Sequence, residues 1–200
     1  MRGWMRRMLS RCASEEGSVT LELLLMTPIL SFAAFGMLVL FDAQRSQSLD
    51  LKAAITVADM LSRERDVVDD TYIDSAWALQ KLVNLHDKTP DLRISLLRYH
   101  TRDEVDESRE VEPHFHVVWS EVRGGALSPL ADADMADYLP RLPVMANEDR
   151  LIVVETQIDY EQPFDIGLNE TKFNAFTFAG PRHVKVCFNN TPSDPSRDLC

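Results

Sequence analysis

Residues 23–41 read LLLMTPILSFAAFGMLVLF, a run of nineteen residues without a charged side chain. At 1.5 Å per residue, a helix of this length is about 28 Å long, close to the roughly 30 Å thickness of a bilayer's hydrocarbon core. Pro28 and Gly36 interrupt the run, but membrane helices tolerate both residue types. Since no other uncharged stretch approaches this length, the sequence predicts one membrane span.

Charge is divided unequally between the two sides of this run. Residues 1–17 hold four arginines and two glutamates, so the other 183 residues carry 17 basic and 30 acidic side chains, a net charge of −13. Because positive loops stay in the cytoplasm, we expect the N-terminus inside and the chain after about residue 42 outside. The net charge of −11 for the whole chain argues against nucleic acid as a partner.

Three interpretations compete for the N-terminal segment. A secretory signal peptide would have a shorter apolar run, of about 7–15 residues, and a cleavage site between small residues. An uncut signal anchor is the second interpretation. Neither explains Glu22, which lies at the start of the apolar run and becomes costly if it is carried toward the bilayer centre.

The sequence EEGSVTLE at residues 15–22 resembles the type III signal of type IV pilins and pseudopilins. That signal is a short basic leader, a glycine, and a glutamate at the fifth position after it. The resemblance implies that a prepilin peptidase cuts between Gly17 and Ser18, and that Glu22 then pairs with a neighbouring subunit's N-terminal amine and sets the assembly register. Many pilins have Phe at the position of Ser18, so this departure fits a minor or Tad-type pilin better.

Helical periodicity continues beyond the predicted span. Residues 42–66 contain neither Gly nor Pro, and Leu51, Ala54, Ala58 and Leu61 recur at helical spacing. We therefore expect one helix from about residue 19 to 65, roughly 70 Å long. A second helix is predicted at about 70–87, with Asp69 or Asp70 as its N-cap.

Strand patterns dominate the rest of the chain. The predicted strands are 92–100, 114–122, 151–160, 172–178 and 183–188. Alternation in 151–160 places Ile152 and Val154 on one face and Glu155 on the other, which predicts an antiparallel sheet with helices on one face and solvent on the other. Residues 126–149 are expected to form a loop with a short helix near 131–138. The predicted fold class is α+β.

A second resemblance lies in the C-terminal half. The sequence RLIVVETQIDYEQPF at 150–164, followed by GPR at 180–182, is similar to TadE/TadG-like proteins of Tad (Flp-type) pilus systems. The resemblance implies a pilin-like minor pilin in the bacterial inner membrane, with a cytoplasmic leader (1–17), a transmembrane and protruding helix (18–66) and a periplasmic domain (67–200). The implied partners are the prepilin peptidase, a TadF-like sister minor pilin, the major pilin and the inner-membrane pilus platform.

The three cysteines are Cys12, Cys187 and Cys200. Cys187 and Cys200 flank a loop rich in Pro, Asn and Ser, and in a periplasmic location they would either form a disulfide or remain free thiols. Cys12 is expected to be free on the cytoplasmic side.

No pattern predicts catalysis. His114 and His116 share a strand face and could be half of a metal site, but no third ligand has suitable spacing. Nucleotide-binding and nucleophile motifs are missing from the sequence, so we expect no catalytic residue, metal or cofactor. The alternative function is an uncleaved, membrane-anchored periplasmic binding or adaptor protein unrelated to pili, which predicts a flexible linker after the span.

Overall fold

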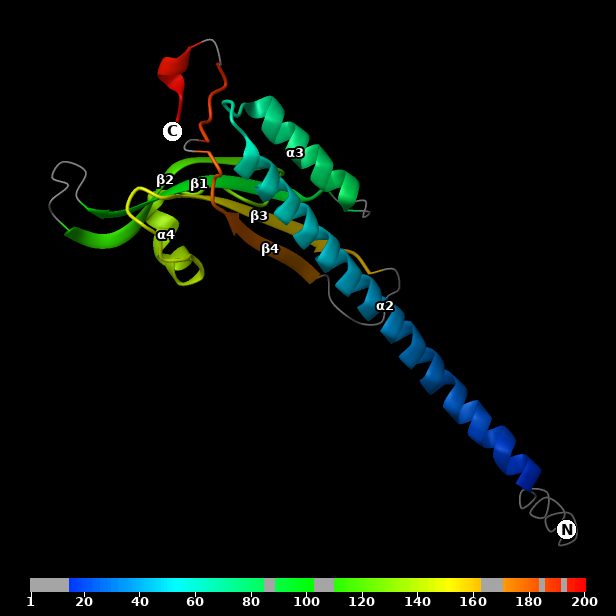
Figure 1. Ribbon diagram of the computed structural model, residues 1–200. Helices are drawn as coiled ribbons and strands as arrows, with labels where there is room; N and C mark the ends of the chain where they lie inside the picture. The colour runs from blue at the N-terminus through cyan, green and yellow to red at the C-terminus, as the bar shows by residue number, and fades with distance from the viewer. Residues whose placement is uncertain (1–14, 85–88, 103–109, 163–170, 184–185, 192–193) are drawn as a thin grey trace, which may run out of the picture. The chain divides into compact units, whose positions relative to one another are not determined.

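The computed structural model describes residues 15–84, 89–102, 110–162, 171–183, 186–191 and 194–200. The described residues fall into two compact units. One holds the N-terminal helix as far as Gln44, and the other holds Arg45–Glu161 together with the described residues from Thr171 onward. The helical and strand elements are shown in Figure 1.

Helix α2 runs from Glu15 to Arg63 and is the element predicted for residues 19–65. Pro28 lies within it, and Thr27 one residue earlier donates its hydroxyl to the carbonyl oxygen of Leu23 at 2.6 Å. The absence of Gly and Pro from the later turns lets the helix continue through residues 42–63. The helix therefore enters the second unit without a linker.

Helix α3, Asp70–Val83, is flanked by two polar cap residues, Asp69 and Asn84. The side chain of Asp69 accepts a 2.8 Å hydrogen bond from the backbone nitrogen of Tyr72, as an N-cap does. The helix ends at Val83, earlier than the predicted residue 87, and residues 85–88 lie outside the described part of the chain.

Four antiparallel strands form a single sheet in the order β2-β1-β3-β4. The strands are β1 (Asp91–Arg102), β2 (Glu110–Arg123), β3 (Arg150–Tyr160) and β4 (Thr171–Ala179). Each matches a predicted strand. Between β2 and β3 the chain forms three short helical segments, η1 (Asp132–Asp134), α4 (Met135–Tyr138) and η2 (Leu139–Arg141), where a short helix was expected.

The fifth predicted strand, 183–188, is wrong for the residues that are described. Val186, Cys187 and Phe188 are all buried, but their backbone pairs with residue 68 instead of the sheet. The nitrogen of Val68 donates to the oxygen of Cys187 at 2.8 Å, and Phe188 forms isolated bridges with Val68 and Leu199. The run is apolar because Val186 and Phe188 belong to a core that they share with helix and strand residues. After it the chain forms a short helix, η3 (Pro195–Arg197).

The first core packs helices on one face of the sheet. The helix residues Ala54, Val57, Ala58 and Leu61 of α2, with Ile73 of α3, contact strand residues such as Ile94 and Ile152. The predicted apolar stripe of α2 is therefore confirmed from Ala54 onward, whereas Leu51 is 41% exposed. Figure 1 shows α3 beside the later turns of α2 on this face.

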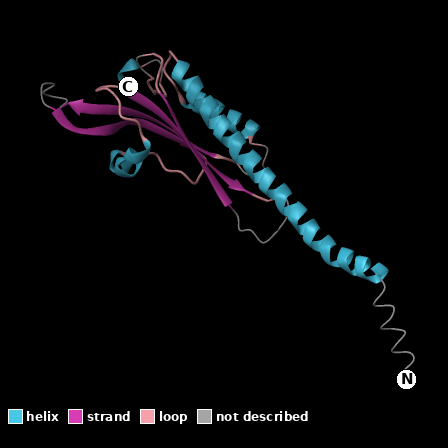
Figure 2. Ribbon diagram, turned by 60° about the horizontal axis from the view of Figure 1, so that its bottom comes forward, coloured by secondary structure: helices cyan, strands magenta, loops and turns pink. Residues whose placement is uncertain are grey.

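The opposite face is also covered, so the expectation of a solvated face is wrong. Leu97, Tyr99, Phe115, Leu151 and Val153 of the strands pack with Leu130 and Met135 into a second core. Figure 2 shows α4 across the strands from α3. The connection 126–149 crosses this face. Its apolar side chains cover strand residues that alternation alone would place in solvent.

Glu155 shows the consequence of this second layer most directly. The alternation placed Glu155 on a solvent face, but its side chain is buried and accepts a 2.7 Å hydrogen bond from Nε of the equally buried Arg93. Tyr138 of α4 donates its hydroxyl to Glu155 Oε1 at 3.1 Å. Burial, followed by the charge of Glu155, raises the pKa of the Tyr138 hydroxyl above its ordinary value.

Candidate functional site

The predicted processing residues Gly17 and Ser18 lie in the first turns of α2, because helical backbone begins at Glu15. The leader residues 1–14, Cys12 included, and the side chains as far as Ser18 lie outside the described residues. Glu22 is exposed, and it is the only charged residue between Ser18 and Phe41.

Most apolar side chains in the turns after Glu22 are exposed, although Val39 is buried. Only 6% of the most apolar window of Val19–Arg63 is buried, and Leu24, Met37 and Phe41 are 75%, 72% and 71% exposed. By length and composition this helix can cross a membrane. A contiguous apolar surface of this size is unfavourable in water, so a lipid environment would stabilise it.

Asp50 is the polar contact that fixes α2 to the rest of its unit. Its carboxylate is 1% exposed and accepts three hydrogen bonds, from Gln80 Nε2 and Asn84 Nδ2 at 3.2 Å each and from Thr156 Oγ1 at 2.6 Å. These donors belong to α3, to its C-cap and to β3. Sequence reasoning missed Asp50, since an acidic residue in an amphipathic helix is normally solvated.

The residues after β4 return to the C-terminal end of α2. The backbone nitrogen of Arg182 donates to the carbonyl oxygen of Ser62 at 2.8 Å, which satisfies one of the last carbonyls of the helix. The guanidinium of Arg182 contacts Asp59 Oδ1 at 3.2 Å, and Asp59 also pairs with Arg63 at 2.8 Å. The Gly180–Arg182 segment is therefore fastened to α2.

A hollow of about 430 Å³ opens beside this attachment. Its lining residues come from the start of β3 and from the segment after β4: Met145, Glu148, Asp149, Arg150, Gly180, Pro181, Arg182 and His183. The sequence segments 150–164 and 180–182 both contribute to it, through Arg150 and through Gly180–Arg182. The structure thus brings together residues that the sequence places 30 positions apart, whereas Pro163 and Phe164 of the first segment lie outside the described residues.

Arg150 is the unusual member of this lining. Among the described residues its guanidinium makes no hydrogen bond, and its Nη1 is buried without a partner. Arg98 lies directly opposite on β1 and is itself held by Glu148, whose Oε2 accepts from Arg98 Nε at 2.7 Å. Burial and the charge of Arg98 lower the pKa of Arg150 below its ordinary value, and Glu148 offsets only part of this effect.

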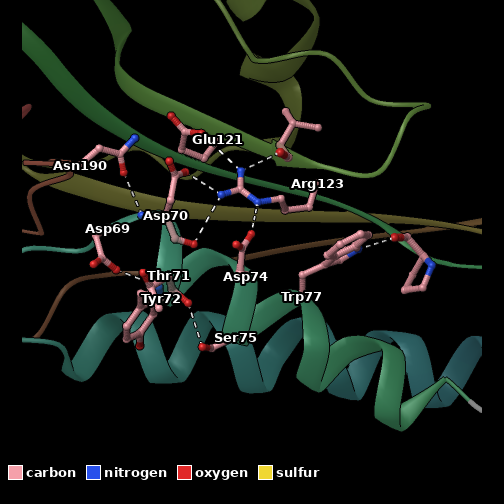
Figure 3. Close-up of polar contacts among 12 residues, drawn as sticks. Asp69, Asp70, Thr71, Tyr72, Asp74, Ser75, Trp77, Glu121, Arg123 and Asn190 are labelled. Atoms are coloured by element: carbon pink, nitrogen blue, oxygen red, sulfur yellow. Dashed lines mark hydrogen bonds and ion pairs between the residues drawn. The ribbon is translucent and has the colours of Figure 1, made fainter.

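A separate polar cluster holds the start of α3 against the end of β2, and Figure 3 shows its side chains. Arg123 donates from Nε to Asp74 Oδ1 at 2.5 Å and from Nη2 to Asp70 Oδ1 at 2.6 Å. Burial by itself would lower the pKa of Arg123, but the bonds to Asp74 and Asp70 raise it overall. The nitrogen of Asp70 also donates to Asn190 Oδ1 at 2.9 Å, so the cluster is structural and fully paired.

Cys187 and Cys200 are joined by a disulfide, with Cα atoms 4.5 Å apart. The bond closes the C-terminal loop over Phe188, which pairs with Leu199 through two 3.0 Å backbone hydrogen bonds. The linkage therefore fixes a segment whose apolar side chains belong to the first core.

The two histidines of β2 lie near a third one, His100 of β1. His114 and His116 lie near His100, with ring centroids 5.5 and 6.5 Å from it. His116 Nδ1 instead contacts Asp132 at 2.8 Å. In the part of the chain that the structure describes, no group of three or more His, Cys, Asp or Glu side chains could hold a metal ion.

Comparison of the chain with protein families, with curated proteins and with solved structures finds no match.

Proposed function

We propose that this chain is a TadE-like minor pilin (pseudopilin) of a Tad/Flp-type pilus, cut after Gly17 by a prepilin peptidase. The observation that carries the proposal is the helix α2 itself. From Ser18 to Phe41 it is mostly apolar and exposed, and Glu22 near the start is the one carboxylate. Its second half is part of a folded core, through Ala54, Val57 and Leu61.

This division of one helix suits a subunit that moves between a membrane and a filament. In either place, the apolar half must be covered by lipid or by the helices of neighbouring subunits. A buried, uncompensated carboxylate is costly, so Glu22 favours the one axial position at which a neighbour's new N-terminal amine meets it. Ser18 supplies that amine after cleavage.

The remaining parts of the proposal follow from the same assignment. The folded unit lies in the periplasm, because the arginines of the leader keep the N-terminus in the cytoplasm. The subunit pairs with a TadF-like sister minor pilin and meets the major pilin and the inner-membrane platform, where it primes assembly or occupies the tip. It is not an enzyme in this proposal.

The rival function is an uncleaved, membrane-anchored adaptor unrelated to pili. That function predicts a flexible linker after the membrane span. The helix instead continues through Arg63, with its later turns in the core of the domain and Asp50 hydrogen-bonded inside it. The continuous helix supports the pilin proposal over the adaptor.

The proposal is tested by Glu22→Ala in a cell that carries the complete pilus system. We expect cleavage after Gly17 to continue and piliation to fall sharply, because the peptidase recognises the glycine and the assembly step needs the carboxylate. Asp42→Ala, at the far end of the apolar run, is the matched acidic control and should leave piliation unchanged. Normal piliation of the Glu22 variant would remove the register role.

A further inference from the structure

We propose that the hollow lined by Arg150 and Arg182 is a binding site for a carboxylate group. The proposal rests on the geometry of the folded unit and is independent of the assignment to pili. Its basis is a guanidinium whose Nη1 has no hydrogen-bond partner, in the lining of a hollow that also holds the guanidinium of Arg182.

Arg150 supplies the donors. A buried Nη1 without a partner is unfavourable, since a polar group removed from water normally recovers a hydrogen bond inside the protein. The planar fork of a guanidinium matches the two oxygens of a carboxylate, which can accept two parallel hydrogen bonds. A bound carboxylate would therefore satisfy Arg150 and also reduce the repulsion between Arg150 and Arg98.

Arg182 supplies the second charge at the hollow. Its contact with Asp59 at 3.2 Å and its backbone bond to Ser62 hold it at the rim, so little ordering is needed when a ligand arrives. The ring of His183 is engaged with another residue, because its Nε2 accepts a 3.2 Å hydrogen bond from Arg65 Nε.

Two acidic residues, Glu148 and Asp149, also line the hollow. Glu148 is engaged with Arg98, and Asp149 Oδ2 accepts from the nitrogen of Ala146 at 3.0 Å. Both carboxylates remain at the hollow and oppose the approach of an anion. A doubly charged phosphate doubles this repulsion and also doubles the attraction to Arg150 and Arg182, so the phosphate titration tests directly whether the site prefers a carboxylate.

The carboxylate can come from a free organic acid or from an acidic side chain of a peptide. A hollow of about 430 Å³ falls within the range of roughly 300–1,000 Å³ for ligand pockets and is far larger than acetate needs. The chemistry is the same for both sources, and the experiment separates them by comparing acetate with a short acidic peptide.

The test uses the full-length chain in zwitterionic detergent micelles, with the arginine Nε–Hε groups observed by nitrogen-15 NMR. Three probes are titrated at constant ionic strength and pH 7: acetate, the acetylated and amidated tripeptide Gly-Glu-Gly, and inorganic phosphate. We expect a saturable shift of the Arg150 resonance with both carboxylates, and no tighter binding of phosphate. If the peptide binds more tightly than acetate, the ligand of the site is an acidic peptide. If the two affinities are equal, a free organic acid is sufficient as the ligand.

Two variants and a control decide the role of the residues. Arg150→Gln should weaken carboxylate binding by about tenfold or more, since it removes charge-assisted hydrogen bonds. Asp149→Asn keeps an oxygen for Ala146 and should tighten binding by about two- to fivefold, since it removes one repelling charge. Arg141→Gln is the matched control, because Arg141 lies outside the hollow and stacks on Phe176 at 3.8 Å.

Several results would overturn the proposal. They are the absence of a saturable shift, tighter binding of phosphate than of acetate, and equal losses of affinity in Arg150→Gln and Arg141→Gln. If Arg150→Gln does not fold by circular dichroism, Asp149→Asn decides the question, and unchanged or weaker binding by that variant refutes the site.

Discussion

Asp50 and Thr156 are 106 residues apart in the sequence, and Thr156 Oγ1 donates a 2.6 Å hydrogen bond to Asp50 Oδ2 in the interior of the folded unit. Both residues are at most 2% exposed. The bond links α2 to β3, and the amides of Gln80 and Asn84 complete the shell of donors around the carboxylate. Gln80 Oε1 is buried without a partner, but the three hydrogen bonds that Asp50 accepts favour a single arrangement of α2, α3 and β3.

Replacing Asp50 by Ala should therefore destabilise the folded unit severely. The substitution leaves three donors in the interior without their acceptor, at roughly 1–3 kcal/mol for each unsatisfied group, so we expect a loss of about 3 kcal/mol or more. Thermal unfolding of the purified full chain, followed by circular dichroism, measures the change. Asp137→Ala is the control, because Asp137 is exposed on α4 and its loss should stay within about 0.5 kcal/mol. Equal melting temperatures for the two variants would contradict the role of Asp50.

Glu121 should make stability depend on pH near the α3 cluster. Burial, followed by the charge of Asp70, raises the pKa of Glu121 above its ordinary value of 4.5, and Arg123 offsets part of this shift. A carboxyl whose pKa is raised in the folded state binds its proton more tightly there, so its contribution to stability is present below pH 4.5 and is lost as the pH rises through the folded-state pKa.

Glu121→Gln should accordingly raise stability at pH 7, by up to about 1 kcal/mol because solvent screens a partly exposed site. The difference from the unmodified chain should disappear below about pH 4.5. Melting temperatures measured between pH 4 and pH 8 follow this difference. Glu112→Gln, an exposed residue of β2, is the control and should shift the curve little. A Glu121 variant that is less stable at pH 7 would show that the contact with Arg123 dominates.

The disulfide should stabilise the C-terminal segment and the core beneath it. Cys187 and Cys200 are 13 residues apart, and closing a loop of this size contributes roughly 3 kcal/mol in the chain-entropy account. We expect Cys187→Ser with Cys200→Ser, or reduction of the unmodified chain, to lower the melting temperature. Cys12→Ser, in the leader, is the control. If reduction leaves the melting temperature unchanged, the disulfide does not hold the segment.

Much of the fold was readable from the sequence, because it depends on local periodicity. The spacing of Ala54, Ala58 and Leu61 predicted the buried stripe of α2, and Asp69 was identified as a cap candidate for α3. Four strands were placed to within a few residues.

The errors concern contacts between distant residues. The side of the sheet that carries Glu155 was assigned to solvent, because alternation cannot show that residues 126–149 fold across it. The buried run at Val186–Phe188 was assigned to a strand, because apolar content does not reveal that its backbone pairs with Val68.

The candidate site was predictable only in parts. Arg150 and Arg182 each lie in a recognisable sequence segment. That both line the same hollow depends on how β3 and β4 pair and on how the chain turns after Ala179. Asp50 gave no signal, since its burial follows from the packing of α2 against α3 and β3. Tertiary packing decides which polar side chains are buried and hydrogen-bonded to one another, and patterns within a single sequence do not reveal that packing.

The central claim is cleavage by a prepilin peptidase, and the intact mass of the mature protein tests it most directly. The chain should be purified from cells with an active peptidase and from cells without one. We predict a mature chain that starts at Ser18 in the first case and an uncut chain that keeps its leader in the second. A chain that starts at Met1 in peptidase-positive cells would contradict the assignment.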